Sequence, residues 1–169
     1  MLVVQPNRNY LGVLARRISE GGYRVATADC GTSAMAELHR LSVDLVLSEL
    51  RMPGTSGIEL SGMIREDPVH RHLPIFLITG KSDADGAVQA YRCGADTVIA
   101  KPFHFEVLIA RIGREIERSQ SLAKLLNDNA ALDARVIGRA IDLAEMRERW
   151  LASEAELRRL QEKVRETEG

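Results

Sequence analysis

The sequence predicts an α/β protein, a doubly wound parallel sheet of five strands followed by a long helix that pairs as a coiled coil. Over residues 1–118, short apolar runs alternate with segments of helical period, which is typical of parallel strands joined by crossover helices. Over residues 119–169, apolar residues recur at heptad spacing and no proline interrupts them. We therefore expect two domains, 1–118 and 119–169.

Five apolar runs are the expected strands. They are too apolar for a sheet with one solvated face, so helices should cover both faces. The expected strands are Leu2–Gln5, Tyr23–Ala28, Val43–Glu49, Pro74–Thr79 and Thr97–Ala100. A first helix is expected between an N-cap at Asn7 and the Gly21-Gly22 pair. The other expected helices cover Ala34–Leu41, Ile58–Ile64, Ala84–Cys93 and Phe105–Ile116.

In a doubly wound sheet, the functional crevice lies at the carboxyl ends of the strands. The candidate site residues are therefore the ones that end or follow the expected strands. They are Gln5, Pro6, Glu49, Thr79 and Lys101.

Composition excludes several classes of function. The formal net charge is −1, and no basic cluster would attract nucleic acid or an anionic membrane. The chain starts without a secretory leader, and no apolar run approaches the roughly 20 residues of a membrane span. We therefore expect a cytoplasmic protein with neither nucleic acid nor membrane as a partner.

The sequence shows no pattern of metal ligands. The two cysteines, Cys30 and Cys93, are far apart and are expected to be reduced thiols. The histidines are expected on helix ends or loops without a shared face, which disfavours a metal or phosphohistidine role. They are His39, His70, His72 and His104.

Three blocks of sequence resemble the receiver domains of two-component response regulators. Their order and spacing agree with that family over about residues 1–118, and the resemblance implies a flavodoxin-like (βα)5 fold. The blocks are Asp44-Leu-Val-Leu-Ser-Glu-Leu-Arg-Met-Pro-Gly-Thr-Ser-Gly57, Ile75-Phe-Leu-Ile-Thr-Gly80, and Gly94-Ala-Asp96 with Lys101-Pro-Phe103.

The resemblance also implies roles for single positions. In the family, a strand-end aspartate accepts a phosphoryl group and an acidic pair after the first strand holds Mg²⁺. A Thr or Ser and a Lys bind the phosphoryl oxygens, and an aromatic residue on the last strand reports the change. Thr79 and Lys101 match the Thr and Lys positions, and Pro102 is expected to have the family's cis peptide bond.

The other positions depart from the family pattern. The acidic pair falls on Gln5 and Pro6, the acceptor on Glu49 and the aromatic on Val98. Phosphoryl transfer to a carboxylate needs Mg²⁺, which carboxylates and waters normally hold. Glu49 is also one methylene longer than aspartate, which displaces its oxygens from the position for in-line attack. We expect a degenerate pseudo-receiver without metal, cofactor or phosphorylation.

Two interpretations of Glu49 stay open at this point. Its carboxylate could replace a phosphoryl group by reaching Lys101 and Thr79, or it could be the product of drift after phosphorylation was lost. Lys101 could then remain only because a partly buried carboxylate needs a cation, and Thr79 only as a β-branched strand residue. Val98 is interpreted as core filling, so the family's switch between the Thr and the aromatic residue should not operate.

A heptad can be written from Leu122 to Val164, and ten of its thirteen a and d positions are apolar. Asn129 at an a position favours a two-stranded, in-register pair, although Asn127-Asp128-Asn129 could equally break the helix. A parallel homodimer is expected. Its seam would contain Leu122, Leu125, Asn129, Leu132, Val136, Leu143, Met146, Trp150, Leu157, Leu160 and Val164.

These features favour a phosphorylation-independent adaptor. It would be a coiled-coil dimer in which the last helices of the receiver-like domain present a face to an unidentified signalling protein. The alternative is the regulatory front of a longer protein, whose coiled coil transmits to a kinase, phosphatase or cyclase. A third alternative, an RNA-binding antiterminator domain, is less favoured, because the segment 131–160 lacks the breaks that would divide it into three short helices. No nucleophile–base pair indicates an enzyme.

Overall fold

The computed structural model describes residues 1–81 and 83–167, with the side chains of residues 164, 166 and 167 excepted. It divides into two compact units, residues 1–121 and residues 122–169. The strands are β1 Leu2–Val4, β2 Ala26–Ala28, β3 Val46–Glu49, β4 Ile75–Thr79 and β5 Thr97–Ala100. The helices are α1 Arg8–Glu20, α2 Gly31–Arg40, α3 Gly57–Glu66, α4 Ala84–Arg92 and α5 Phe105–Thr167.

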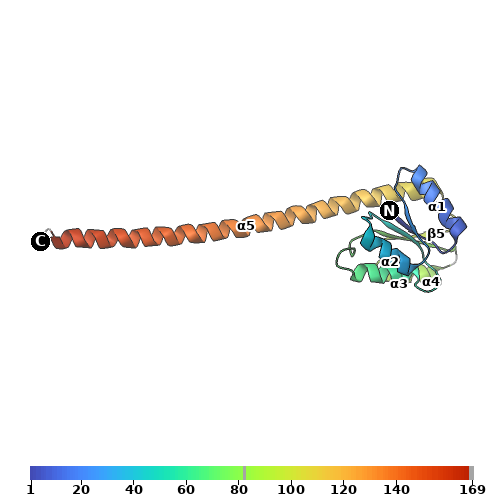
Figure 1. Ribbon diagram of the computed structural model, residues 1–169, viewed down its shortest axis with the longest axis horizontal. Helices are drawn as coiled ribbons and strands as arrows, with labels where there is room; N and C mark the ends of the chain where they lie inside the picture. Colours follow the sequence, from blue (N-terminus) through green and yellow to red (C-terminus); the bar gives the residue numbers. More distant parts are fainter. Residues whose placement is uncertain (82, 168–169) are drawn as a thin grey trace. The chain divides into compact units, whose positions relative to one another are not determined.

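The five strands form one parallel sheet in the order β2-β1-β3-β4-β5. Strands and helices alternate along the chain (Figure 1). Each helix therefore carries the chain from the carboxyl end of one strand back to the amino edge of the sheet, where the next parallel strand begins. The order reverses between β1 and β3, because β2 lies to one side of β1 and the later strands lie to the other. The predicted doubly wound fold is confirmed.

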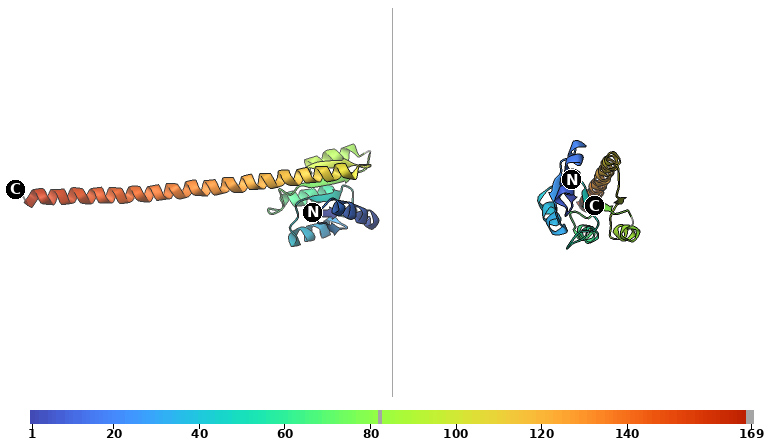
Figure 2. Two further views of the ribbon diagram at one scale, coloured as in Figure 1. Left: turned by 90° about the horizontal axis from the view of Figure 1, so that it is seen from above. Right: turned by 90° about the vertical axis from the view of Figure 1, so that its right-hand side faces the viewer.

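Each face of the sheet is covered by its own hydrophobic cluster. Alternate residues of a strand point to opposite faces, so Leu77 of β4 belongs to one cluster and its neighbour Phe76 to the other. The first cluster lies under α2, α3 and α4 and contains Leu38 and Leu60. The second lies under α1 and the beginning of α5 and contains Ile112. Figure 2 shows α2, α3 and α4 together on one side of the sheet.

Local sequence signals explain where two of the helices begin. The predicted N-cap is confirmed, because Asn7 Oδ1 accepts a hydrogen bond from the Tyr10 backbone N at 3.0 Å. Helix α3 begins with a capping box, in which Ser56 Oγ accepts from Glu59 N and Glu59 Oε2 accepts from Ser56 N.

Strand β4 begins one residue later than predicted, and β2 and β3 each begin three residues later. The run Tyr23–Ala28 pairs only from Ala26, because β2 has β1 as its one neighbour in the sheet and the register places Ala26 opposite Leu2. The run Val43–Glu49 likewise forms a strand only from Val46, which lies opposite Leu2 on the other side of β1. Tyr23 and Val43 are packed against the two clusters outside the strands, so burial rather than pairing explains their apolar character.

The second unit is the continuation of α5, which runs without a break through residues 127–129. The helix-break interpretation of those residues is therefore wrong. Nine apolar seam residues have exposed fractions between 51% and 66% in the single chain. They are Leu122, Leu125, Leu132, Val136, Leu143, Met146, Trp150, Leu157 and Leu160. Asn129 is also exposed, and the side chain of Val164 lies outside the described part of the structure.

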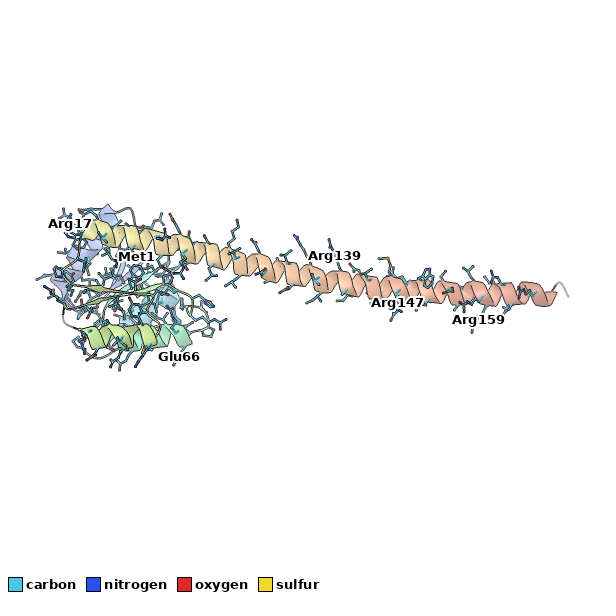
Figure 3. All side chains as sticks on the ribbon, turned by 180° about the vertical axis from the view of Figure 1, so that it is seen from behind. Met1, Arg17, Glu66, Arg139, Arg147 and Arg159 are labelled. Atoms are coloured by element: carbon cyan, nitrogen blue, oxygen red, sulfur yellow. The ribbon has the colours of Figure 1, made fainter. Side chains whose placement is uncertain are left out.

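Charged residues lie among these apolar positions, and Arg139 occupies a d position of the heptad. Figure 3 shows the side chains of this helix, with Arg139, Arg147 and Arg159 labelled. Within one helix, Arg149 pairs with Glu145 and Arg158 with Glu154 at i,i+4 spacing. Among residues 1–81 and 83–167, no helix combines the length and the apolar character needed to cross a bilayer.

Candidate functional site

Three predicted site residues meet at the carboxyl edge of the sheet. Gln5 follows β1, Glu49 ends β3 and Lys101 follows β5. Lys101 Nζ donates to Glu49 Oε2 at 2.7 Å, and Gln5 Nε2 donates to the same oxygen at 2.6 Å. One carboxylate oxygen therefore accepts a hydrogen bond from an ammonium group and another from an amide.

The surroundings fix the direction of the Gln5 amide. Its Oε1 accepts a hydrogen bond from the Asn7 backbone N at 3.0 Å, so its NH₂ group is the end that faces Glu49. Gln5 is buried, and the Glu49 side chain is only 14% exposed. Lys101 is about one-third exposed, so the site opens to solvent on the lysine side.

Tyr10 of α1 also belongs to the site, although the sequence analysis did not include it. Lys101 Nζ lies 4.6 Å from the centroid of the Tyr10 ring, within the range of a cation–π contact. Burial raises the pKa of the Tyr10 hydroxyl, and the nearby negative charge of Glu49 raises it further. The sequence signal that could have indicated this role is the position of Tyr10 three residues after the Asn7 N-cap. That spacing places Tyr10 in the first turn of α1, near the end of β1.

The backbone approaches Glu49 closely at the start of α3. A Cβ atom on Gly57 would clash with the carbonyl oxygen of Glu49 and would lie 3.0 Å from Leu50 Cα. Gly57 N also donates to Leu50 O at 2.9 Å. Only a residue without a side chain fits this contact, so Gly57 helps to position the end of β3.

The loop after β5 is held in a defined place. The peptide bond between Lys101 and Pro102 is cis, as the resemblance implied. The Lys101 backbone N donates to the carbonyl of Thr79 at 2.8 Å. This hydrogen bond links the last residue of β4 to the residue that follows β5.

Thr79 lies in the expected place, but the described hydrogen bonds do not join it to Glu49. Its hydroxyl instead donates to Asp83 Oδ2 at 3.4 Å. Arg51, in the loop after β3, donates to both carboxylate oxygens of Asp83, through Nε at 2.5 Å and an NH₂ group at 2.7 Å. Of the two contacts included in the interpretation of Glu49 as a phosphoryl replacement, the described hydrogen bonds contain the one from Lys101 and not the one from Thr79.

Asp83 is the second site residue that the sequence analysis missed. It is the N-cap of α4 and accepts a hydrogen bond from Gly86 N at 3.1 Å. The hydrogen bond from Arg51 is the main cause that holds the pKa of the Asp83 carboxyl below its usual value. An Asp at the start of a helix is a recognisable cap, but its pairing with Arg51 joins residues 32 positions apart.

Val98 is half-buried and packs against the first hydrophobic cluster, in agreement with its interpretation as core filling. Its backbone N donates to the Tyr91 hydroxyl at 3.2 Å. Beside it lies a cavity of about 290 Å³ between β5 and the start of α5. The lining includes Val98, Phe103, Val107, Leu108 and Arg111.

The expectation that the histidines share no face is wrong for two of them. The ring centroids of His39 and His70 lie 5.4 Å apart, with Asp67 beside both. The reason is that the carboxyl end of α2 lies next to the turn that follows α3, a tertiary contact that local sequence does not reveal.

The comparisons with known proteins agree with this geometry. Residues 1–113 match the family model described as the response regulator receiver domain. A "Probable cyclic di-GMP phosphodiesterase" of Vibrio cholerae serotype O1 is 29% identical over 161 residues, which are 94% of this chain. The chemotaxis protein CheY of Pseudomonas aeruginosa is 34% identical over 98 residues, covering 58% of this chain and 79% of CheY.

A solved structure shows the same architecture. The signal receiver domain of a signal transduction histidine kinase from Syntrophus aciditrophicus is 29% identical, with a TM-score of 0.65. The match covers 69% of this chain and 88% of that domain. The chain spans only 36% of the length of the Vibrio phosphodiesterase. Together, the family match, the sheet order and the arrangement around Glu49 show that this chain belongs to the response regulator receiver domain family.

Proposed function

We propose that the chain is a phosphorylation-independent signalling adaptor of response-regulator type, which acts through protein–protein contacts as a coiled-coil dimer. The observation that carries this proposal is the shared acceptor at Glu49. The oxygen to which Lys101 donates is also bonded by a neutral amide at a position where the family has a carboxylate.

The first step of the argument concerns the metal. Mg²⁺ is held by carboxylates and other oxygen ligands, and it neutralises the charge of the transferred phosphoryl group. At the family's three acidic positions, Glu49 supplies the one carboxylate, Gln5 turns its NH₂ group toward it, and Pro6 has no side-chain donor atoms. The amide oxygen of Gln5 is engaged by the Asn7 backbone. This donor set does not fit Mg²⁺, so no phosphoryl step is assigned to the site.

The second step concerns the state of the loop. In the family, the lysine binds a phosphoryl oxygen once the aspartate is modified. Here Lys101 already has an anionic partner at 2.7 Å, and its backbone is bonded to Thr79. In the unmodified protein, the contacts of Lys101 with Glu49 and Thr79 would thus keep the ends of β4 and β5 in one arrangement without an input signal.

The third step concerns the partner surface. Val88 and Tyr91 of α4 and Val107 of α5 are each about half exposed although they are large and apolar. They flank β5, whose residue Val98 lines the cavity of about 290 Å³. An apolar protein segment is the occupant that this surface fits best, since exposed apolar residues of this kind are typical of protein contacts.

The proposal is tested by incubating the intact chain with acetyl phosphate and Mg²⁺ and measuring its intact mass. No phosphoryl adduct is expected on the wild type or on Glu49→Asp, because Gln5 and Pro6 remain in both. A phosphorylation-competent receiver domain treated in parallel is the positive control. A phosphoryl mass located on Glu49 would refute the proposal.

A second candidate function has its own observation. The match to the Vibrio phosphodiesterase runs over 161 residues and so includes the region of the long helix as well as the receiver domain. This favours a chain that is the regulatory front of a longer protein, with a cyclic di-GMP phosphodiesterase as its output. An immunoblot of source cells would distinguish the two, because the adaptor predicts a polypeptide of about 169 residues and the alternative a much longer one.

A further inference from the structure

We propose that His39, Asp67 and His70 form a binding site for a divalent transition metal, with Zn²⁺ as the ion that fits best. One ligand atom from each residue lies within 4.8 Å of the other two. His39 is at the end of α2, Asp67 is the C-cap of α3, and His70 follows in the next turn. Glu66, labelled in Figure 3, is the last residue of α3 and marks the place.

Two of the three ligand separations are close to those around a tetrahedral ion, with each histidine facing a different oxygen of Asp67. His39 Nε2 lies 3.2 Å from Asp67 Oδ2, and His70 Nδ1 lies 3.4 Å from Asp67 Oδ1. Ligands at roughly 2.0–2.2 Å from a tetrahedral Zn²⁺ are themselves about 3.3 Å apart. Two imidazoles and one carboxylate are a ligand set that suits Zn²⁺ better than Mg²⁺ or Ca²⁺, which prefer oxygen alone.

The hydrogen bond of the His39 ring to the backbone also points to a cation. Its Nδ1 lies 3.1 Å from the carbonyl oxygen of Met35, which can only accept, so the proton of the neutral ring belongs on Nδ1. The lone pair of Nε2 then faces a carboxylate oxygen at 3.2 Å. Two electron-rich atoms at this distance repel unless a second proton or a metal ion lies between them. A backbone carbonyl that orients a ligating histidine in this way is common in metal sites.

The ring of His70 has a nitrogen without a hydrogen-bond partner in the described part of the chain, 3.4 Å from Asp67 Oδ1. This atom, Nδ1, is buried. Buried polar atoms are normally paired, so an atom left without a partner next to a carboxylate needs an explanation. A metal ion bound between His70, His39 and Asp67 provides one.

Asp67 is prepared to act as an anionic ligand. Hydrogen bonds from its own turn orient its carboxylate. Both described backbone bonds, from Val69 N and His70 N, go to Oδ1. Oδ2 is the oxygen that faces His39.

The site is separate from the one at Glu49. Helices α2 and α3 each run back toward the start of the next strand, so their last residues lie at the amino edge of the sheet. Glu49 lies at the carboxyl edge. A bound ion would tie the end of α2 to the turn after α3 and stabilise the receiver unit without contacting Glu49. His39 is 58% exposed, which leaves a path for the ion to enter.

The experiment uses the full chain, freed of metal by chelation, and titrates it with Zn²⁺ against a chromophoric chelator. We expect one Zn²⁺ per chain and a higher melting temperature when Zn²⁺ is present. His39→Asn and His70→Asn should each weaken binding by at least about 10-fold and remove most of the thermal shift. His72→Asn and His104→Asn are matched controls on exposed histidines and should bind as the wild type does.

His39→Asn decides the outcome, because an exposed position tolerates substitution without loss of the fold. The proposal is overturned if the wild type binds no Zn²⁺, or if His39→Asn binds it as tightly. Zn²⁺ bound by Cys30 or Cys93 would produce the second result. A stability that falls in His39→Asn but does not respond to Zn²⁺ in the wild type would identify a stabilising His39–Asp67 contact without a metal, and would overturn the proposal.

Discussion

Lys101 and Glu49 are 52 positions apart in the sequence, and their charged groups lie 2.7 Å apart at the carboxyl edge of the sheet. The contact does not stand alone, since Gln5 donates to the same carboxylate oxygen and the ring of Tyr10 lies beneath the ammonium group. The carboxylate of Glu49 therefore binds the residue that follows β1 and the residue that follows β5, and Tyr10 of α1 contacts the same lysine.

The first prediction concerns Glu49→Gln, which keeps the size of the side chain and removes its charge. Lys101 and Gln5 would both lose their anionic acceptor, so the free energy of unfolding should fall by about 1.5–3 kcal/mol, the range for hydrogen bonds to a charged group. Because Lys101 N is bonded to the Thr79 carbonyl, amide exchange should also accelerate over residues 79–81 and 83–85. Hydrogen exchange with mass spectrometry measures this.

The matched control is Glu66→Gln, which removes one charge from an exposed position at the end of α3. It should leave exchange in the loop after β4 unchanged. If Glu49→Gln also leaves that exchange unchanged, the hypothesis that Glu49 keeps the loop after β4 in one arrangement is wrong. Glu49 is then best interpreted as the product of drift.

The second prediction compares two glycines of α3. Gly57→Ala would force a Cβ against the Glu49 carbonyl oxygen, so we expect a loss of stability of about 1–3 kcal/mol. Gly62→Ala lies in the same helix with open space at its Cβ position, and it should be neutral or stabilising by up to about 1 kcal/mol. Urea unfolding of both variants tests the pair. Equal effects would show that the close approach at Gly57 does not constrain the chain.

The third prediction concerns the pH dependence of the Arg51–Asp83 pair. The usual pKa of the Asp83 side chain is 3.8, and the hydrogen bond from Arg51 lowers it in the folded state. Folded Asp83 therefore binds fewer protons than unfolded Asp83, so the pair's contribution is fully present above about pH 3.8 and is lost as pH falls through the lower folded value. Asp83→Asn should destabilise the protein at pH 7, with a difference from wild type that shrinks at acid pH.

Melting curves between pH 7 and pH 3 measure this difference. The exposed guanidinium of Arg51 also makes the pair sensitive to salt, so 1 M KCl should reduce the effect of Asp83→Asn. Asp85→Asn is the matched control, because it removes a neighbouring exposed carboxylate in the first turn of α4. A difference for Asp83→Asn that is independent of both pH and salt would contradict the assignment to an ion pair.

Sequence periodicity was sufficient to predict the fold, because the two patterns used, apolar runs for strands and helical spacing of apolar residues for helices, are both local. A run such as Ile75–Thr79 is apolar throughout because helices bury both of its faces, and the number of such runs determines the number of strands. The start of a strand was less predictable. Tyr23 is apolar because it packs against the second cluster, yet it lies outside the strand because pairing with β1 begins at Ala26.

The site could be predicted only where the topology alone determines position. Glu49 and Lys101 end or follow parallel strands, so they meet at one edge of the sheet whatever their side chains do. The partners of Thr79 and the position of Tyr10 depend on side-chain directions in a helix and a loop. The pair His39 and His70 was missed for a related reason, since only the packing of α2 beside the turn after α3 brings them together.

The last prediction concerns self-association through the second unit. Nine of its ten apolar seam residues, all those whose side chains the structure describes, are each more than half exposed in a single chain, and burying them in a pair is favourable by roughly 25 cal/mol per Å². Their heptad spacing places them along one side of the helix, which is the arrangement that a two-stranded coiled coil buries. We therefore expect the wild-type chain to be a dimer by light scattering.

The test is the double variant Leu143→Asp with Leu157→Asp, which places two charges in the seam. Burying unpaired carboxylates would cost several kcal/mol, so this variant should be monomeric at micromolar concentration while its receiver unit stays folded. Ala134→Asp with Ala155→Asp adds the same charges at exposed positions away from the seam and should remain a dimer. A monomeric wild type, or a seam variant that dimerises as well as the control, would rule out the coiled coil.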